Sequence, residues 1–197
     1  MKFENSKGFT LIELAVVLGV LGILSAALVM SGTKGRRAAY VDNAAIRLES
    51  ALKETQAFGK AGRAFPLGVD PETDDTVFDR GYGVNVQEGS GVIYVYGGRG
   101  DGSNPLDSIY VSGNVTETIT FDGGVTVAAG GITTTTSGGV EPSEINIFFR
   151  RGANEVDICV NNCQNASQIK DDVTIRIESE GQERSVFVNK EGLIYTL

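Results

Sequence analysis

Among the residues that could take part in chemistry, Glu13 stands out by its surroundings. It is the one charged residue between Gly8 and Lys34, within the stretch KGFTLIELAVVLGVLGILSAALVM at residues 7–30. A carboxylate in hydrocarbon is unfavourable by about 2.5–3.5 kcal/mol on insertion scales, so such a group normally has an assigned partner. We therefore expect a cation to neutralise Glu13.

The rest of the chemical inventory is sparse. The sequence contains no histidine, which removes the commonest general base, the commonest zinc ligand and every Ser-His or Cys-His nucleophile pair. The chain carries 17 basic and 25 acidic residues, a formal charge of −8, which counts against nucleic acid as the main ligand. We expect a protein that is not an enzyme, with no cofactor and no metal.

The two cysteines, Cys159 and Cys163, have the spacing C-x3-C. Two thiolates without histidine do not complete a tetrahedral zinc site. A disulfide across a tight loop is favoured if this part of the chain is extracytoplasmic, and free buried thiols are the alternative.

Two acidic stretches suggest loops rather than sites. In GGRGDGSNPLD, at residues 97–107, oxygen ligands for calcium are available, but the EF-hand spacing is missing and the same residue types favour a turn. The stretch DPETDD at residues 70–75 is expected to be a solvated loop. The calcium-binding residues in the first stretch would be Asp101, Ser103, Asn104 and Asp107.

The segment around Glu13 is long enough to cross a membrane. All 17 residues from Leu14 to Met30 are apolar or small, and the run reaches 22 residues when Phe9 to Glu13 are included. This length suits one helical crossing of a bilayer. A secretory signal peptide and a plain hydrophobic anchor are the alternatives, although neither explains Glu13.

The order of residues at this N-terminus carries a resemblance. Lys7-Gly8-Phe9-Thr10-Leu11-Ile12-Glu13-Leu14, followed by the apolar run, resembles the class III signal of type IV prepilins and type II secretion pseudopilins. The resemblance implies that a prepilin peptidase cuts between Gly8 and Phe9 and that Phe9 becomes N-methylated. It also implies that the methylated amine of one subunit neutralises Glu13 of a neighbour during filament assembly. The expected partners are therefore the peptidase and other pilin or pseudopilin subunits.

A second helical pattern follows three basic residues, Lys34, Arg36 and Arg37. Apolar residues recur with helical spacing and form one stripe that should pack on a sheet. No proline separates this pattern from the apolar run, so one helix from about Phe9 to about Phe58 is expected. The stripe consists of Val41, Ala45, Leu48 and Leu52.

The remainder of the chain has the pattern of short strands. Runs rich in β-branched and aromatic residues are separated by glycine, asparagine and aspartate at short intervals, which favours antiparallel hairpins. The runs are YGVNV, GVIYVYGG, IYVSG, ETITF, GVTVA, EINIFF, VDICV, VTIRIES, RSVFVN and LIYTL. The last third resembles the C-terminal part of the H-type minor pseudopilins and their pilus counterparts.

These observations predict an α+β protein in which a long N-terminal helix packs on an antiparallel β-rich head. The expected domains are a leader at residues 1–8, a transmembrane or filament-core helix at 9–31, an amphipathic half at 32–60 and the head at 61–197.

The expected function is that of a structural subunit of a type IV pilus-like or type II secretion filament. A binding protein at a pilus tip, an adhesin or DNA receptor, is the alternative, and a membrane-anchored enzyme is less favoured. Lys34, Arg36 and Arg37 rival Lys2 and Lys7 in charge, so the resemblance rather than charge decides the topology. It implies a single-pass inner-membrane protein with an extracytoplasmic head that later enters an extracellular or periplasmic filament.

Overall fold

The computed structural model describes residues 10–61, 81–98, 110, 114–135, 142–152, 156–161 and 169–197, with side chains except at 29–34. The chain divides into two compact units, Met1–Arg37 and Ala38–Leu197. The predicted domain limits at residues 8, 31 and 60 remain predictions.

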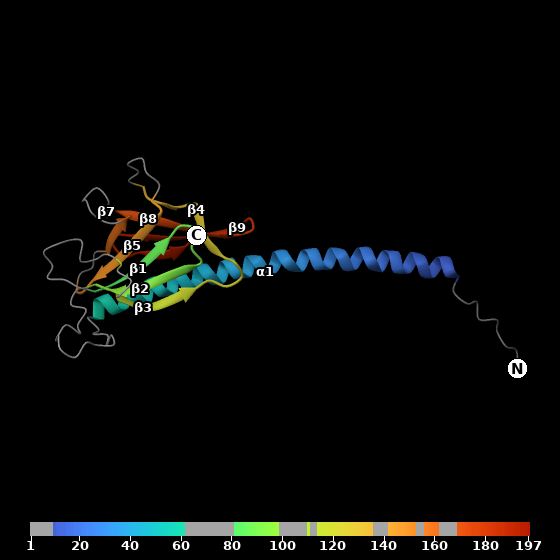
Figure 1. The fold of residues 1–197 in the computed structure, drawn as a ribbon, viewed down its shortest axis with the longest axis horizontal. Helices are drawn as coiled ribbons and strands as arrows, with labels where there is room; N and C mark the ends of the chain where they lie inside the picture. Colours follow the sequence, from blue (N-terminus) through green and yellow to red (C-terminus); the bar gives the residue numbers. More distant parts are fainter. Residues whose placement is uncertain are drawn as a thin grey trace, which may run out of the picture. The chain divides into compact units, whose positions relative to one another are not determined.

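One helix accounts for the N-terminal third of the chain. Helix α1 extends over Leu11–Ala61 without interruption (Figure 1). Its predicted end lay near Phe58, and the observed helix is three residues longer, with Lys60 in the last turn, where a cation interacts favourably with the helix dipole. Within α1, Leu11–Leu28 is long and apolar enough to cross a membrane, judged by length and composition alone.

The first sheet has six antiparallel strands in the order β3-β2-β1-β5-β6-β7. Pairing of β1 with both β2 and β5 places β1 inside the sheet, with Val84 opposite Val95 on one side and Ile147 on the other. The strands are β1 Gly81–Gln87, β2 Val92–Gly97, β3 Val115–Thr120, β5 Glu144–Arg150, β6 Val156–Val160 and β7 Ile169–Lys170.

The second sheet has four antiparallel strands in the order β10-β9-β8-β4. Backbone hydrogen bonds link it to the first sheet at two places: Gly89 N donates to Val127 O at 2.9 Å, and Val156 N donates to Lys190 O at 2.8 Å. The strands are β4 Thr126–Thr133, β8 Asp172–Ser179, β9 Gln182–Asn189 and β10 Ile194–Thr196.

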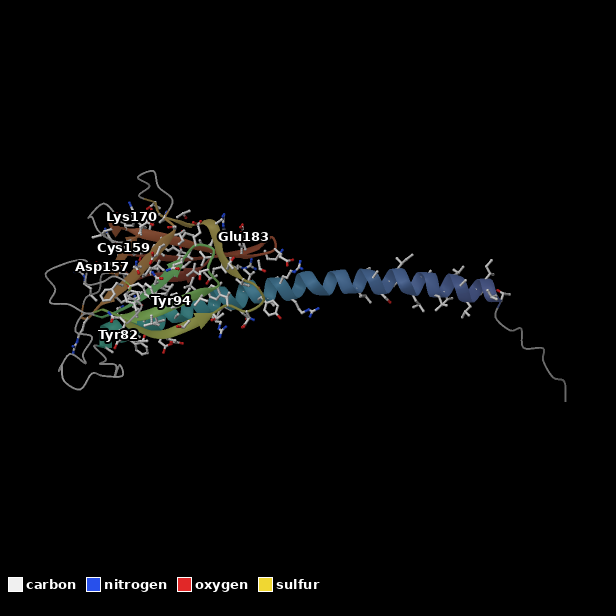
Figure 2. All side chains as sticks on the ribbon, in the orientation of Figure 1. Tyr82, Tyr94, Asp157, Cys159, Lys170 and Glu183 are labelled. Atoms are coloured by element: carbon white, nitrogen blue, oxygen red, sulfur yellow. The ribbon has the colours of Figure 1, made fainter. Side chains whose placement is uncertain are left out.

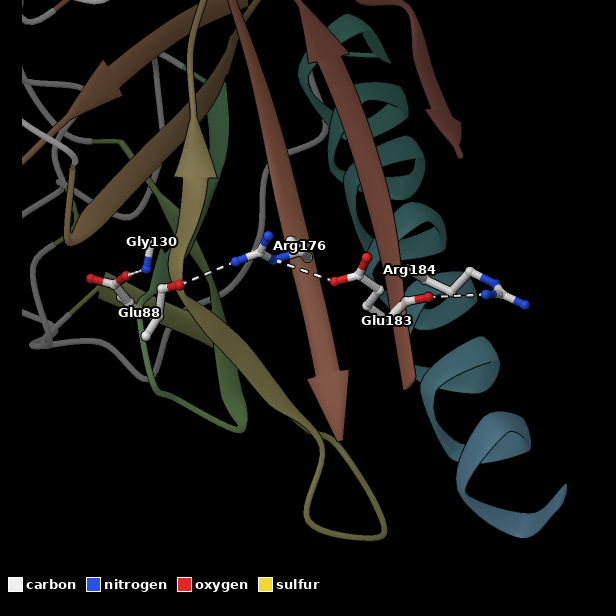
Figure 3. A network of polar contacts seen from close by, with 6 residues as sticks. Glu88, Gly130, Arg176, Glu183 and Arg184 are labelled. Atoms are coloured by element: carbon white, nitrogen blue, oxygen red, sulfur yellow. Dashed lines mark hydrogen bonds and ion pairs between the residues drawn. The ribbon is translucent and has the colours of Figure 1, made fainter. Parts of the chain in front are cut away.

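Strand β4 contains an irregularity that a network of polar contacts holds in place. The register with β8 shifts between Val127 and Ile132, and Gly130 has a φ of 60°. Glu88 accepts a hydrogen bond from Gly130 N, and Arg176 donates to the carbonyl of Ala129 (Figure 3). These contacts satisfy the backbone groups that the bulge removes from the β-ladder.

The apolar stripe of the Ala38–Leu197 unit packs as predicted. Val41, Ala45, Leu48 and Leu52 are buried and share one core with both sheets. Along β8, buried residues alternate with partly buried ones, as expected for a strand with one face towards the core. Two polar contacts also join α1 to β9 and to the turn that follows β9. Gln56 Nε2 donates to Gly192 O at 2.8 Å, and Arg184 pairs with Asp42 at 2.8 Å.

The predicted α+β arrangement of a long helix on antiparallel sheets is therefore confirmed. Nine of the ten predicted runs match strands of the structure, and β4 extends further than predicted, through its two glycines to Thr133. The IYVSG run lies outside the described residues apart from Tyr110, and the DPETDD loop lies entirely outside them.

Candidate functional site

The helix begins with a reciprocal set of hydrogen bonds between Thr10 and Glu13. Glu13 Oε2 accepts from Thr10 N at 2.9 Å and from Thr10 Oγ1 at 2.8 Å. In return, Glu13 N donates to Thr10 Oγ1 at 3.3 Å. This is the geometry of a capping box, in which Thr10 is the N-cap and Glu13 is the third helical residue.

The capping box gives Glu13 a role within its own chain that the sequence interpretation did not include. The pattern Thr10-x-x-Glu13 ahead of an apolar run was the signal that could have shown it. Both side-chain contacts use Oε2, and within the described part of the chain Oε1 makes no hydrogen bond. The carboxylate therefore keeps one oxygen for a second donor.

Gly8 and Phe9, the residues expected at the cleavage position, lie outside the described residues. Their roles remain predictions from the sequence. Thr10 follows Phe9 in the sequence, so the capping box begins at the second residue after the expected cleavage position.

The helix surface around and beyond Glu13 is apolar and exposed on all sides. Its large side chains stand out from the helix (Figure 2), and Leu11 and Leu28 expose 86% and 74% of their surface. A Cβ added at Gly19 or Gly22 would meet no atom within 4 Å. Such a surface is stable only against lipid or against other apolar helices.

Of the two cysteines, only Cys159 lies among the described residues. It is buried on β6, close to Asp157 and Lys170 (Figure 2). Cys163 lies outside them, so the disulfide between the two remains a prediction.

The loop sites considered in the sequence are largely outside the described residues. This holds for Asp101, Ser103, Asn104 and Asp107 and for the acidic residues at 70–75. Within the residues that the structure does describe, no three His, Cys, Asp or Glu side chains form a group that could hold a metal ion.

The head contains a buried polar cluster on the face of the first sheet that points away from the apolar core. Asn85 Nδ2 donates to Glu144 Oε1 at 2.6 Å and to Asn146 Oδ1 at 2.9 Å. The neighbouring Tyr96 ring lies against Gly83, where a Cβ would approach it to 2.4 Å. Burial, followed by the charges of Glu144 and Asp157, raises the pKa of the Tyr96 phenol well above its ordinary value. The Tyr96 phenol is therefore held in its neutral form.

Comparison with protein families places the N-terminal site in a known context. Residues 4–29 match the prokaryotic N-terminal methylation motif, a motif typical of type IV pilins and type II secretion pseudopilins. The match contains the capping box and the whole apolar helix as far as Val29. Neither the curated proteins nor the solved structures give a match to this chain.

Proposed function

We propose that this chain, a prepilin-like protein with an N-terminal methylation motif, is a structural subunit of a type IV pilus-like or type II secretion filament. The motif implies processing by a prepilin peptidase, here between Gly8 and Phe9, with N-methylation of Phe9. The pilin-type motif also suggests a structural, non-enzymatic protein. Whether the subunit belongs to the H-type minor class rests on the sequence pattern of the last third.

One observation carries this proposal: a carboxylate lies in the first turn of a helix whose apolar surface is exposed over Leu11–Leu28. In a single subunit this surface requires a bilayer, and in a filament it requires neighbouring helices. In a helix that merely anchored the protein, the charge of Glu13 would disfavour insertion, and a neutral residue could serve as the cap partner of Thr10.

Cleavage would supply the cation that Glu13 needs. A cut after Gly8 creates an amine at Phe9, and methylation leaves that amine positively charged. In the cleaved chain, this amine would directly precede the N-cap Thr10. Glu13 Oε1 makes no hydrogen bond within the described residues, so it can accept one from another chain. We propose that Oε1 accepts the amine of a neighbouring subunit while Thr10 continues to hold Oε2.

Before assembly, the span would hold the subunit in the inner membrane with the head on the extracytoplasmic side. That compartment favours disulfides, and Cys159 is already ordered on β6. We propose a Cys159–Cys163 disulfide that fixes the end of this strand.

The proposal is tested with Glu13→Gln, which keeps the shape and the capping contacts but removes the charge. We expect the variant to be cut and methylated normally, as shown by intact mass, and to yield at least tenfold fewer filaments in sheared-cell fractions, since an ion pair in a low-dielectric site contributes over about 1.4 kcal/mol. Glu54→Gln, on an exposed part of the same helix, is the matched control and should assemble normally. Normal assembly of Glu13→Gln would overturn the proposal.

A further inference from the structure

The outer edge of the second sheet lies beside side chains of α1. Strand β10 is the last strand of this sheet and pairs with β9 alone. We propose that Glu49 and Gln56, here called the edge guard, occupy backbone groups at this edge and so prevent a second copy of the chain from adding its own β10 to the sheet. This inference lies wholly within the Ala38–Leu197 unit and goes beyond the proposed filament role.

The pairing of β10 with β9 shows which backbone groups point to the outer edge. Leu197 N donates to Ser185 O at 2.8 Å, so these two residues form a hydrogen-bonded pair. In an antiparallel ladder, hydrogen-bonded pairs alternate with non-hydrogen-bonded pairs. The N–H and C=O groups of Ile194 and Thr196 therefore point away from β9, towards the position that a further strand would take.

Two side chains of α1 supply an acceptor and a donor at this edge. Glu49 Oε2 accepts a hydrogen bond from Thr196 Oγ1. Lys53 and then the Thr196 hydroxyl lower the pKa of the Glu49 carboxyl most, and the Thr196 N–H contributes to the same lowering. At the other end of β10, Gln56 Nε2 donates to the carbonyl of Gly192 at 2.8 Å. A neighbouring strand would offer the same two kinds of group, a C=O acceptor and an N–H donor.

The spacing on α1 aligns these side chains with the hairpin of β9 and β10. Glu49 and Gln56 are seven positions apart, which places them within about 20° of each other around the helix axis. Asp42 lies seven positions before Glu49, on the same line, and pairs with Arg184 of β9 at 2.8 Å. One line of polar side chains on α1 therefore follows the edge of the second sheet.

The other outermost strands that the structure describes carry protection of their own. β3 has the exposed charge of Glu117, and a bulge interrupts the register of β4. β7 has only two residues, and one of them is Lys170. Charges, bulges and short strands all disfavour edge-to-edge pairing. β10 has no charge, proline or bulge from Ile194 to Thr196, so its protection falls to α1.

An unguarded β10 would suit a second copy of the chain in one register. Antiparallel pairing with Ile194 of one copy opposite Thr196 of the other uses all the outward backbone groups of both strands. In this register Tyr195 lies opposite Tyr195 of the second copy. The exposed side chains of Leu193 and Leu197 lie opposite each other, so apolar groups would meet along the whole pair.

Hydrogen exchange of single backbone amides, measured on the full chain in micelles, tests whether the guard covers the edge. Glu49→Ala/Gln56→Ala removes the guard, and we expect the Thr196 amide to exchange about fivefold faster because it loses its acceptor. The Leu197 amide, which donates to β9, should keep its wild-type rate and shows that the sheet is folded.

The matched control is Asn43→Ala/Glu54→Ala. It also removes one carboxamide and one carboxylate from α1, but at exposed positions. Both amides should exchange in this control at the wild-type rates.

Cross-linking of the full chain in bilayers tests what the guard excludes. Tyr195→Cys is introduced into the wild-type chain, the guard variant and the control. Opposite residues of a non-hydrogen-bonded pair have Cα atoms about 4.5 Å apart, which suits a disulfide. After oxidation, the guard variant should give about fivefold more disulfide-linked dimer than either of the other two proteins.

Equal Thr196 exchange rates in the guard variant and the control would overturn the proposal. Faster exchange without additional dimer would also overturn it, because the edge would then be covered but would not attract a second copy. If the Leu197 rate shows that the guard variant is not folded, Thr196→Val replaces it, since this change takes the hydroxyl away from Glu49 and keeps a β-branched residue in the strand. The same rise in dimer is expected with Thr196→Val, and an unchanged yield would refute the guard.

Discussion

Thr10 and Glu13 act as a pair at the scale of single residues. The hydroxyl of Thr10 and the carboxylate of Glu13 satisfy orphan groups at the helix start within a single chain. Within the single chain, this local role already orients Glu13. An assembly site that is already ordered loses less conformational entropy when the partner binds.

Replacing Thr10 tests this preorganisation. Thr10→Val keeps the shape of the side chain but removes its hydroxyl, so the N-cap should lose about 1 kcal/mol. Amide hydrogen exchange of Glu13 and Leu14, whose N–H groups donate to Thr10, should then be about fivefold faster in micelles, because this loss promotes local opening. Thr10→Ser retains the hydroxyl and should exchange at the wild-type rate. Equal exchange in all three proteins would show that the capping box does not stabilise the helix start.

Glu49 offers a pH-dependent measurement in the head. Hydrogen bonds from Lys53 and, second, from Thr196 lower the pKa of its carboxyl below the ordinary 4.5. The stabilisation by the charged Glu49 carboxylate is therefore fully present above about pH 4.5, and it is lost as pH falls through the lower pKa of the folded state. At pH 7, Glu49→Gln should be less stable than wild type by about 1 kcal/mol, and the gap should close in acid.

Thermal unfolding in micelles between pH 7 and pH 3 measures this gap. Glu54→Gln on the same helix is the control for the loss of one negative charge. A gap for Glu49→Gln that stays constant with pH would show that the Thr196 and Lys53 contacts do not stabilise the charged form.

The sequence supported the residue-scale interpretation only where the partners are close along the chain. Glu13 was identifiable because a single charge interrupts an apolar run, and its cap Thr10 lies three positions away. The contact between Glu49 and Thr196 spans 147 positions, and no local pattern indicates it.

At the scale of elements, two glycines of α1 differ in their surroundings, and only Gly59 lies against the sheet. A Cβ on Gly59 would lie 2.6 Å from the carbonyl oxygen of Phe149 in β5, whereas a Cβ on Gly35 would meet nothing within 4 Å. Gly59 therefore permits the close approach of helix and sheet because it has no side chain. Its φ is not in the left-handed region, so backbone conformation does not require a glycine there.

Alanine substitution should separate these two glycines. Gly59→Ala should destabilise the head by about 1–3 kcal/mol, because the backbone of β5 must shift to accommodate the methyl group. Gly35→Ala should leave head stability unchanged and raise helix propensity by about 1 kcal/mol. Chemical unfolding followed by near-ultraviolet circular dichroism reports head stability, and equal effects of the two changes would contradict the close approach.

The apolar stripe provides a second comparison within α1. Leu48 is fully buried, whereas Ile46, two positions earlier, exposes 57% of its surface. Leu48→Ala should cost about 2–5 kcal/mol because it leaves a cavity, and Ile46→Ala should change the free energy of unfolding by about 0.5 kcal/mol or less. Similar costs for both would mean that the helix packs on the sheets through a different face.

Elements were predictable from the sequence where one period dominates, and their assembly was not. Val41 to Leu52 showed a helical period, and the β-branched runs indicated strands. The division into two sheets and the bulge of β4 were not predicted. The bulge depends on Glu88 and Arg176, which lie 42 and 47 positions away from the residues that they contact.

At the scale of the whole molecule, the chain joins two parts with opposite solvent requirements. The N-terminal unit carries an exposed apolar surface, and residues 38–197 form an acidic, well-packed head. The N-terminal methylation motif was predictable from the sequence because it is local and continuous over residues 4–29, whereas the roles of Gly8 and Phe9 stay predictions. A ligand of the head was not predictable, because binding surfaces are assembled from residues distant in sequence.

The central claim, that this chain is processed as a prepilin, is tested most directly at its N-terminus. The full chain is expressed with a prepilin peptidase, and its intact mass and N-terminal peptide are recorded. We predict a product that begins with N-methyl-Phe9. An uncut chain, or cleavage near Ala26 or later, would contradict the account and leave an anchored or secreted β-rich domain in place of a filament subunit.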